Sequence, residues 1–94
     1  MNKVLKALDT FLEENRLTSE NFTEDKALLD NVPKVLKYTS ILTVKRDDRA
    51  LLLFVCDKDS FWIDYIDNKS DTGTIMLRGR LEKFLKSAGI TQVR

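Results

Sequence analysis

Five aspartates within residues 57–71 are the densest group of potentially reactive side chains in this 94-residue chain. Paired carboxylates can transfer protons or bind a divalent cation. Residues 67–73 partly match the start of a calcium loop, but Lys69 stands where an acid belongs and Arg78 stands where the final Glu belongs. We therefore predict solvated turns and no metal site. The five acids are Asp57, Asp59, Asp64, Asp67 and Asp71.

The chain has no histidine and a single cysteine, Cys56. A Cys/His zinc site within one chain is therefore excluded, as is a Ser-His or Cys-His nucleophile pair. Cys56 ends an apolar run, which predicts a small buried hydrophobic side chain rather than a reactive thiol. An intrachain disulfide is impossible, which favours a reducing cytoplasm. We predict a protein that is not an enzyme and that holds no cofactor.

Basic side chains concentrate in two segments, although the net charge is only +1. Residues 73–94 carry five basic side chains and one acidic one, and two arginines flank an expected turn near residue 47. Such side chains can contact phosphates, yet a pI of about 7.8 is below that of dedicated nucleic-acid-binding domains. An amphipathic helix also places basic residues on its solvated face. The candidate nucleic-acid contacts are Arg46, Arg49, Arg78, Arg80, Lys83 and Lys86.

Hydrophobic spacing predicts a helix over residues 2–16, because Val4, Leu8 and Phe11 recur at helical intervals. A polar linker with Phe22 as an apolar anchor follows at residues 17–22. A second helix is expected to begin at Thr23 and to end near residue 31, before Pro33.

Three strands are expected in the middle of the chain. Residues 34–38 fit either a helical turn or an extended segment, and we favour a strand over residues 35–46. Strands over residues 50–56 and 61–66 would follow through short turns, the first at residues 47–48, as an antiparallel meander.

The last part of the chain allows two interpretations. Residues 74–77 form either a fourth strand or the beginning of the last helix. We favour the strand, because Gly79 inside a helix costs about 1 kcal/mol relative to alanine. The last helix is then expected over residues 80–88, with Gly89 as its C-terminal cap.

These elements predict a single α+β domain over residues 1–94. It comprises N-terminal helices, an antiparallel β-meander of three to four strands, and a C-terminal helix packed on the sheet. Residues 50–56 are all apolar, so the side chains that point to either face of the central strand must be covered. Either the helices divide between the two faces, or all helices share one face and a partner or a second copy covers the other.

With no catalytic motif, the sequence favours a protein-binding or regulatory role. A small chain of this kind fits an accessory protein, an inhibitor, or a phage or mobile-element product. Trp62, Asp64 and Ile66 are the interface candidates, because tryptophan is enriched at binding hot spots. The alternative is a nucleic-acid-binding protein that uses the last helix and the turn at residues 46–49. We expect a cytoplasmic location, because residues 1–16 do not resemble a signal peptide and no apolar run is long enough to span a membrane.

Overall fold

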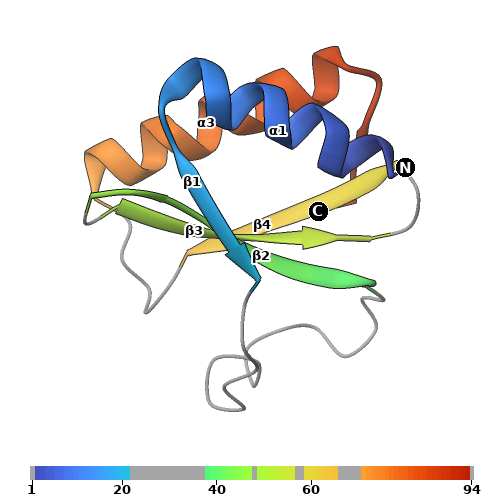
Figure 1. The fold of residues 1–94 in the computed structure, drawn as a ribbon, viewed down its shortest axis with the longest axis horizontal. Helices are drawn as coiled ribbons and strands as arrows, with labels where there is room; N and C mark the ends of the chain where they lie inside the picture. Colours follow the sequence, from blue (N-terminus) through green and yellow to red (C-terminus); the bar gives the residue numbers. More distant parts are fainter. Residues whose placement is uncertain (1, 22–37, 48, 57–58, 66–70, 94) are drawn as a thin grey trace.

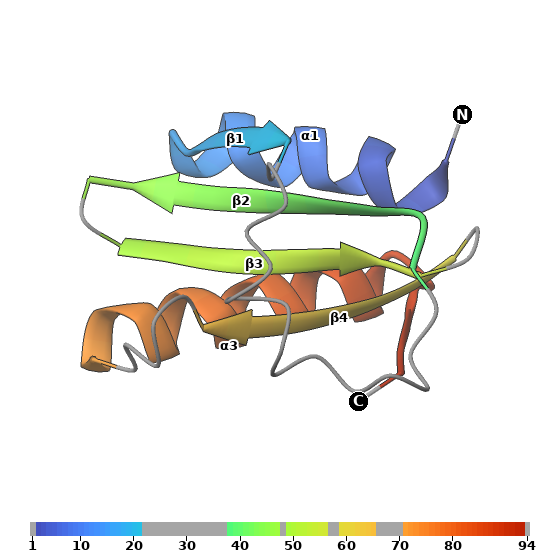
Figure 2. The same ribbon diagram turned by 90° about the horizontal axis from the view of Figure 1, so that it is seen from below.

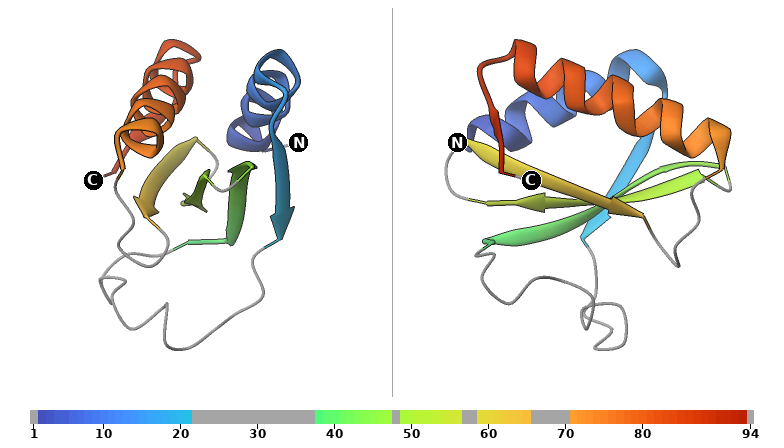
Figure 3. Two further views of the ribbon diagram at one scale, coloured as in Figure 1. Left: turned by 90° about the vertical axis from the view of Figure 1, so that its left-hand side faces the viewer. Right: turned by 180° about the vertical axis from the view of Figure 1, so that it is seen from behind.

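The computed structural model describes residues 2–21, 38–47, 49–56, 59–65 and 71–93. Two helices, α1 (Lys3–Asn15) and α3 (Thr72–Ser87), lie side by side on one face of a sheet (Figure 1; Figure 3). The predicted α+β class is confirmed, as is the packing of the C-terminal helix on the sheet. The alternative that places α1 and α3 on opposite faces is wrong, because both contribute to the same core.

The sheet contains five strands in the order β1-β2-β3-β4-β5. Figure 2 shows β1 to β4 side by side. The first four pair antiparallel, which confirms the predicted meander, and β5 pairs parallel with β4. The number of strands is five rather than three to four. The strands are β1 (Thr18–Asn21), β2 (Ser40–Arg46), β3 (Arg49–Val55), β4 (Ser60–Tyr65) and β5 (Thr91–Gln92).

The edge strand β1 lies where the sequence predicts a polar linker, and that prediction is wrong. Its residues have no apolar alternation, so the strand depends on pairing with β2, where Ser19 lies opposite Val44. The Thr43 hydroxyl also donates to the Glu20 carbonyl oxygen at 3.2 Å. Polar edge strands of this kind protect a sheet against further pairing, and they leave little hydrophobic signal.

Helix α3 begins at Thr72, so the strand predicted at residues 74–77 is wrong and the last helix is longer than predicted. The Asp71 side chain caps it by accepting the Thr74 backbone N–H at 2.8 Å. Helical geometry then buries Thr74 and Leu77 against the sheet, together with Leu81. Full burial of one leucine contributes roughly 1.5–3 kcal/mol, which exceeds the cost of a glycine inside the helix.

Gly79 lies in the middle of α3, is exposed, and would find no atom within 4 Å of an added Cβ. We therefore expect Gly79→Ala to raise the free energy of unfolding by about 1 kcal/mol, as measured by urea denaturation. Gly89→Ala is the matched comparison, because Gly89 has a φ of 83° and an added Cβ would lie 3.0 Å from the Lys3 Nζ atom. It should lower stability, and equal effects of the two variants would contradict this account.

Gly89 ends α3 as predicted. Its positive φ turns the chain back so that the Ile90 N–H donates to the Leu85 carbonyl oxygen at 3.1 Å. Ile90 is consequently buried beside Leu85. This is the arrangement in which an apolar residue after a glycine cap packs back on the last turn.

Apolar side chains are buried on both faces of the sheet. The main core lies beneath α1 and α3 and includes Leu53 and Phe61, which are fully buried. A second cluster on the opposite face comprises Ile41, Leu52, Phe54, Cys56 and Trp62. These five side chains are buried within the single chain, so a partner is not required to cover them. The predicted burial of Cys56 is confirmed.

Some predictions fall on residues outside the described ranges. They concern the helix from Thr23, the anchor Phe22, most of residues 34–38, and Ile66. Among the helices that the structure describes, none combines the length and the hydrophobicity needed to cross a bilayer.

Candidate functional site

Three of the predicted basic residues line one pocket of about 330 Å³, the arginine pocket. Arg46 and Arg49 lie opposite each other where β2 and β3 meet, so their side chains leave the same end of the sheet. Arg80 comes from α3, whose first two turns form the remaining wall. The pocket is lined by Arg46, Arg49, Thr72, Gly73, Met76, Leu77 and Arg80.

The guanidinium of Arg49 lies directly against Gly73. A Cβ built at Gly73 would be only 2.5 Å from the Arg49 Cζ and Nε atoms. Arg49 can therefore take this position only because residue 73 has no side chain. Hydrogen bonds from Thr74 lower the pKa of the neighbouring Asp71 carboxyl, and the positive charge of Arg49 lowers it further. The ionised Asp71 cap at the N-terminus of α3 is therefore stabilised in part by Arg49, a residue that lines the pocket.

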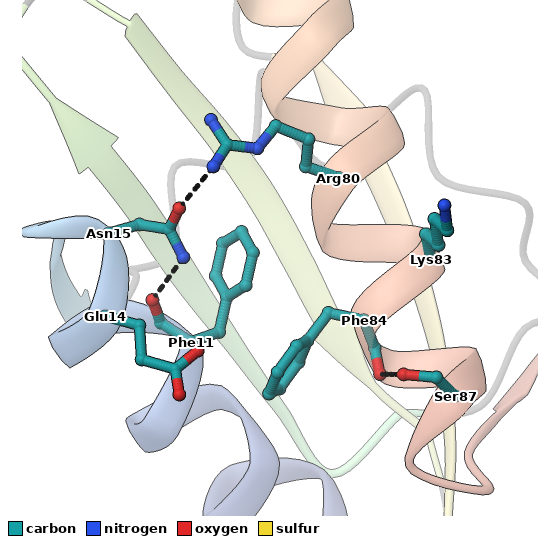
Figure 4. Close-up of a pocket in the computed structure, with 7 residues that line it drawn as sticks. All are labelled: Phe11, Glu14, Asn15, Arg80, Lys83, Phe84 and Ser87. Atoms are coloured by element: carbon teal, nitrogen blue, oxygen red, sulfur yellow. Dashed lines mark hydrogen bonds between the residues drawn. The ribbon is translucent and has the colours of Figure 1, made fainter.

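Arg80 also borders a groove between α1 and α3, where it is held by Asn15 (Figure 4). The Arg80 guanidinium donates to the Asn15 Oδ1 atom at 2.7 Å. The Asn15 amide nitrogen in turn donates to the Phe11 carbonyl oxygen at 2.8 Å. Lys83 is among the residues that line the same groove, in which the Phe11 and Phe84 ring centroids are 5.4 Å apart. Arg80 therefore lines both this groove and the arginine pocket.

The other predicted basic residues do not join this group. Arg78 pairs with Glu82 at 3.1 Å and lies over the Tyr65 ring, with its Cζ atom 4.8 Å from the ring centroid. Lys86 lies in the last turn of α3 and lines neither cavity. The structure therefore brings together Arg46, Arg49 and Arg80, places Lys83 next to Arg80, and separates Arg78 and Lys86 from them.

Two large apolar side chains are exposed on α3, and one of them, Met76, lines the arginine pocket. Ile75 is 50% exposed and Met76 is 63% exposed, on the first two turns of α3. We use the name α3 surface for Arg46, Arg49, Ile75, Met76 and Arg80. Sequence reasoning missed the two apolar members because it assigned residues 74–77 to a strand. The helical spacing of Leu77, Leu81 and Leu85 is the signal that would have placed them outward.

Trp62 and Asp64, the two interface candidates within the described ranges, lie on the sheet face opposite the helices. Trp62 is only 6% exposed, and its ring centroid is 4.4 Å from that of Phe54. Asp64 is partly buried on the same face, and its Oδ1 atom accepts the Tyr65 N–H at 2.8 Å. A role of these two residues in an interface stays a prediction.

The acidic residues do not gather in the described part of the chain. Within it, no three Asp, Glu, Cys or His side chains are close enough to hold a metal ion. Comparison with protein-family models, with curated proteins and with solved structures finds no match. The function must therefore be inferred from the geometry of the chain itself.

The lowered pKa of Asp71 gives its helix cap a pH dependence. The unfolded carboxyl has a pKa of 3.8, so the ionised cap contributes its full stability above that pH. The contribution is lost as the pH falls through the lower folded pKa. Asp71→Asn keeps a capping side chain that cannot titrate. We expect the stability difference between the wild type and this variant to shrink on acidification below about pH 4, as measured by urea unfolding. A difference that is independent of pH would contradict this expectation.

Proposed function

We propose that the chain is a small non-enzymatic regulatory protein, of accessory or inhibitor type, which docks onto a protein partner through the α3 surface. The observation that supports this proposal most directly is the exposure of Met76, which lines the arginine pocket with three arginines, together with the exposure of Ile75, the preceding residue of α3. Methionine and arginine are enriched at protein interfaces, whereas lysine and acidic residues are depleted. Large adjacent apolar side chains are also costly to leave in water without a partner.

The partner surface that fits is acidic with apolar side chains between the acids. Arginine forks bind carboxylates through two parallel hydrogen bonds, and this geometry gives specificity. In the described ranges, the only ion pair within 4 Å is Arg78–Glu82, so none of the three arginines of the α3 surface has an acidic partner there. Gly79, exposed on the same helix, lets a partner approach the α3 backbone closely.

The α3 surface is a better docking candidate than the face that carries Trp62. Ile75 and Met76 are accessible in the single chain, whereas Trp62 is 6% exposed and packs on Phe54. Docking through Trp62 would first require the apolar cluster on that face of the sheet to become exposed. We also propose a cytoplasmic location, supported by the single, buried cysteine.

The proposal is tested by a tagged pulldown from cell lysate with matched variants. Met76→Glu places a charge in the centre of the α3 surface, and Thr10→Glu places the same charge at an exposed position on α1. A partner captured by the wild type should be retained by Thr10→Glu and lost by Met76→Glu. Nuclease treatment should not release it.

Three outcomes would contradict the proposal. A captured protein that both variants retain equally would place docking elsewhere. Recovery of a second copy of this chain alone would indicate self-association. Loss of the captured protein after nuclease treatment would indicate that nucleic acid mediates the contact.

Nucleic-acid binding is the second candidate function, and the grouping of Arg46, Arg49 and Arg80 with the nearby Lys83 favours it. It requires affinity that falls steeply as salt is added. The double variant Arg80→Glu/Lys83→Glu should then abolish binding to a labelled oligonucleotide. No measurable binding of DNA or RNA at low salt would exclude this function.

A further inference from the structure

The arginine pocket gathers positive charge. Among the described residues that line it, three are arginines, Arg46, Arg49 and Arg80, and none is acidic. Asp71 caps α3 next to the pocket, and Asp47 follows Arg46 in the turn between β2 and β3. None of the three arginines forms an ion pair within the described ranges. Like charges held close together are destabilising in isolation and are compensated when an anion binds.

We propose that the arginine pocket binds a phosphate group, of the kind carried by a phosphate monoester. Guanidinium groups bind phosphate oxygens through two parallel hydrogen bonds, and three arginines line this one pocket. The positive end of α3 adds to the attraction.

The shape of the pocket also suits a phosphate attached to a carbon chain. Its volume of about 330 Å³ is roughly ten times the share of one liquid water molecule. Met76 and Leu77 form an apolar wall, which fits the carbon atoms that carry the phosphate. The carrier that we assign is a phosphorylated side chain of the protein partner, and this assignment rests on the proposed function.

The arrangement of the arginines is specific, because two of them are positioned by neighbours. Arg49 occupies the space that a Gly73 side chain would fill, and Arg80 is held by Asn15. Gly73→Ala must therefore displace the Arg49 guanidinium without any change in net charge. This variant therefore distinguishes binding at a site that depends on the position of Arg49 from attraction by overall positive charge.

The experiment is an NMR titration of the folded protein with inorganic phosphate at pH 7.5 and constant ionic strength, with acetate as the comparison anion. We expect saturable shifts in the first turn of α3 and at Arg46 and Arg49, with phosphate bound several-fold more tightly than acetate. Gly73→Ala and Arg49→Gln should each weaken binding about tenfold, as expected for one charge-assisted contact. Lys6→Gln removes the same charge from an exposed site on α1 and should leave binding unchanged.

The phosphate site would be overturned if Arg49→Gln and Lys6→Gln weakened phosphate binding equally, or if Gly73→Ala bound phosphate as tightly as the wild type. Chemical-shift changes spread over the exposed lysines would also overturn it. The unfolding midpoint of each variant shows that it is folded, and Arg49→Gln tests the pocket even if Gly73→Ala does not fold.

The source of the phosphate is tested with two further probes. A phosphoserine peptide should bind more tightly than its unphosphorylated form, and also more tightly than a 5′-phosphorylated oligonucleotide. The reverse order would overturn the assignment to a protein partner. The titration with inorganic phosphate needs no partner. If the pulldown captures no partner but phosphate binding saturates, only the proposed function is contradicted. If a partner is captured through the α3 surface but phosphate does not bind, only the phosphate site is contradicted.

Discussion

Trp62→Ala is expected to lower the free energy of unfolding by about 3–5 kcal/mol, the usual cost of truncating a large buried aromatic side chain. Trp62 is 6% exposed and belongs to the cluster on the sheet face opposite the helices. Its ring lies against Phe54 with centroids 4.4 Å apart, and Phe54 also contacts Tyr38. A domain of this size has a total stability of about 5–15 kcal/mol, so the variant should be close to unfolding.

Urea denaturation followed by circular dichroism measures this effect. Phe61→Ala is the matched comparison, because Phe61 is the fully buried neighbour on the helix-covered face. The two variants should be destabilised to a similar extent. A change below about 1 kcal/mol for Trp62→Ala, a cost typical of a surface position, combined with loss of partner binding, would instead restore Trp62 as an interface residue.

Arg80→Glu is expected to weaken binding of the protein partner by about 100-fold, which corresponds to about 2.7 kcal/mol. The variant removes one of three guanidiniums from the arginine pocket and adds a charge that repels an acidic partner. It also removes the hydrogen bond to Asn15, which costs the folded state only about 1 kcal/mol. Binding should therefore be lost in a protein that is still folded.

Isothermal titration calorimetry with the captured partner measures this loss. Lys6→Glu makes the same charge reversal at an exposed site on α1 and should change the affinity less than about threefold. Equal losses for the two variants would mean that only the overall charge matters. An unchanged affinity of Arg80→Glu would remove Arg80 from the docking surface.

Most of the central sheet could be predicted from the sequence, because its signal is local. The β-branched and apolar residues of β2 to β4 have the composition of strands, and the short connections between them require antiparallel pairing. The helix α1 and the cap at Gly89 follow from equally local patterns. In each case, residues adjacent in sequence determine the conformation.

The errors arose where contacts distant in sequence decide the outcome. β1 is stabilised by pairing with β2, more than twenty residues away, and its own residues are polar. The first half of α3 is helical because the sheet buries Thr74 and Leu77, which outweighs the local cost of Gly79. Local propensity is a weak guide in such places, since tertiary packing regularly overrides it.

The candidate site, like the fold, could be predicted only in part from the sequence. All three arginines of the pocket were named from the sequence, but their grouping required the β2–β3 turn to lie at the start of α3. Arg78 belonged to the same basic segment, yet helical geometry turns it toward Glu82 and Tyr65. Ile75 and Met76 became candidates only when their helical register was known.

Site-specific photo-crosslinking in the native cell would test the central claim most directly. A photoreactive benzoylphenylalanine would be placed at residue 76, which is exposed on the α3 surface, and at residue 10, exposed on α1, as the control. We predict that residue 76 crosslinks to one protein in good yield and that residue 10 does not. Crosslinks from residue 76 to nucleic acid, or none from residue 76 with a partner captured from residue 10, would contradict docking through the α3 surface.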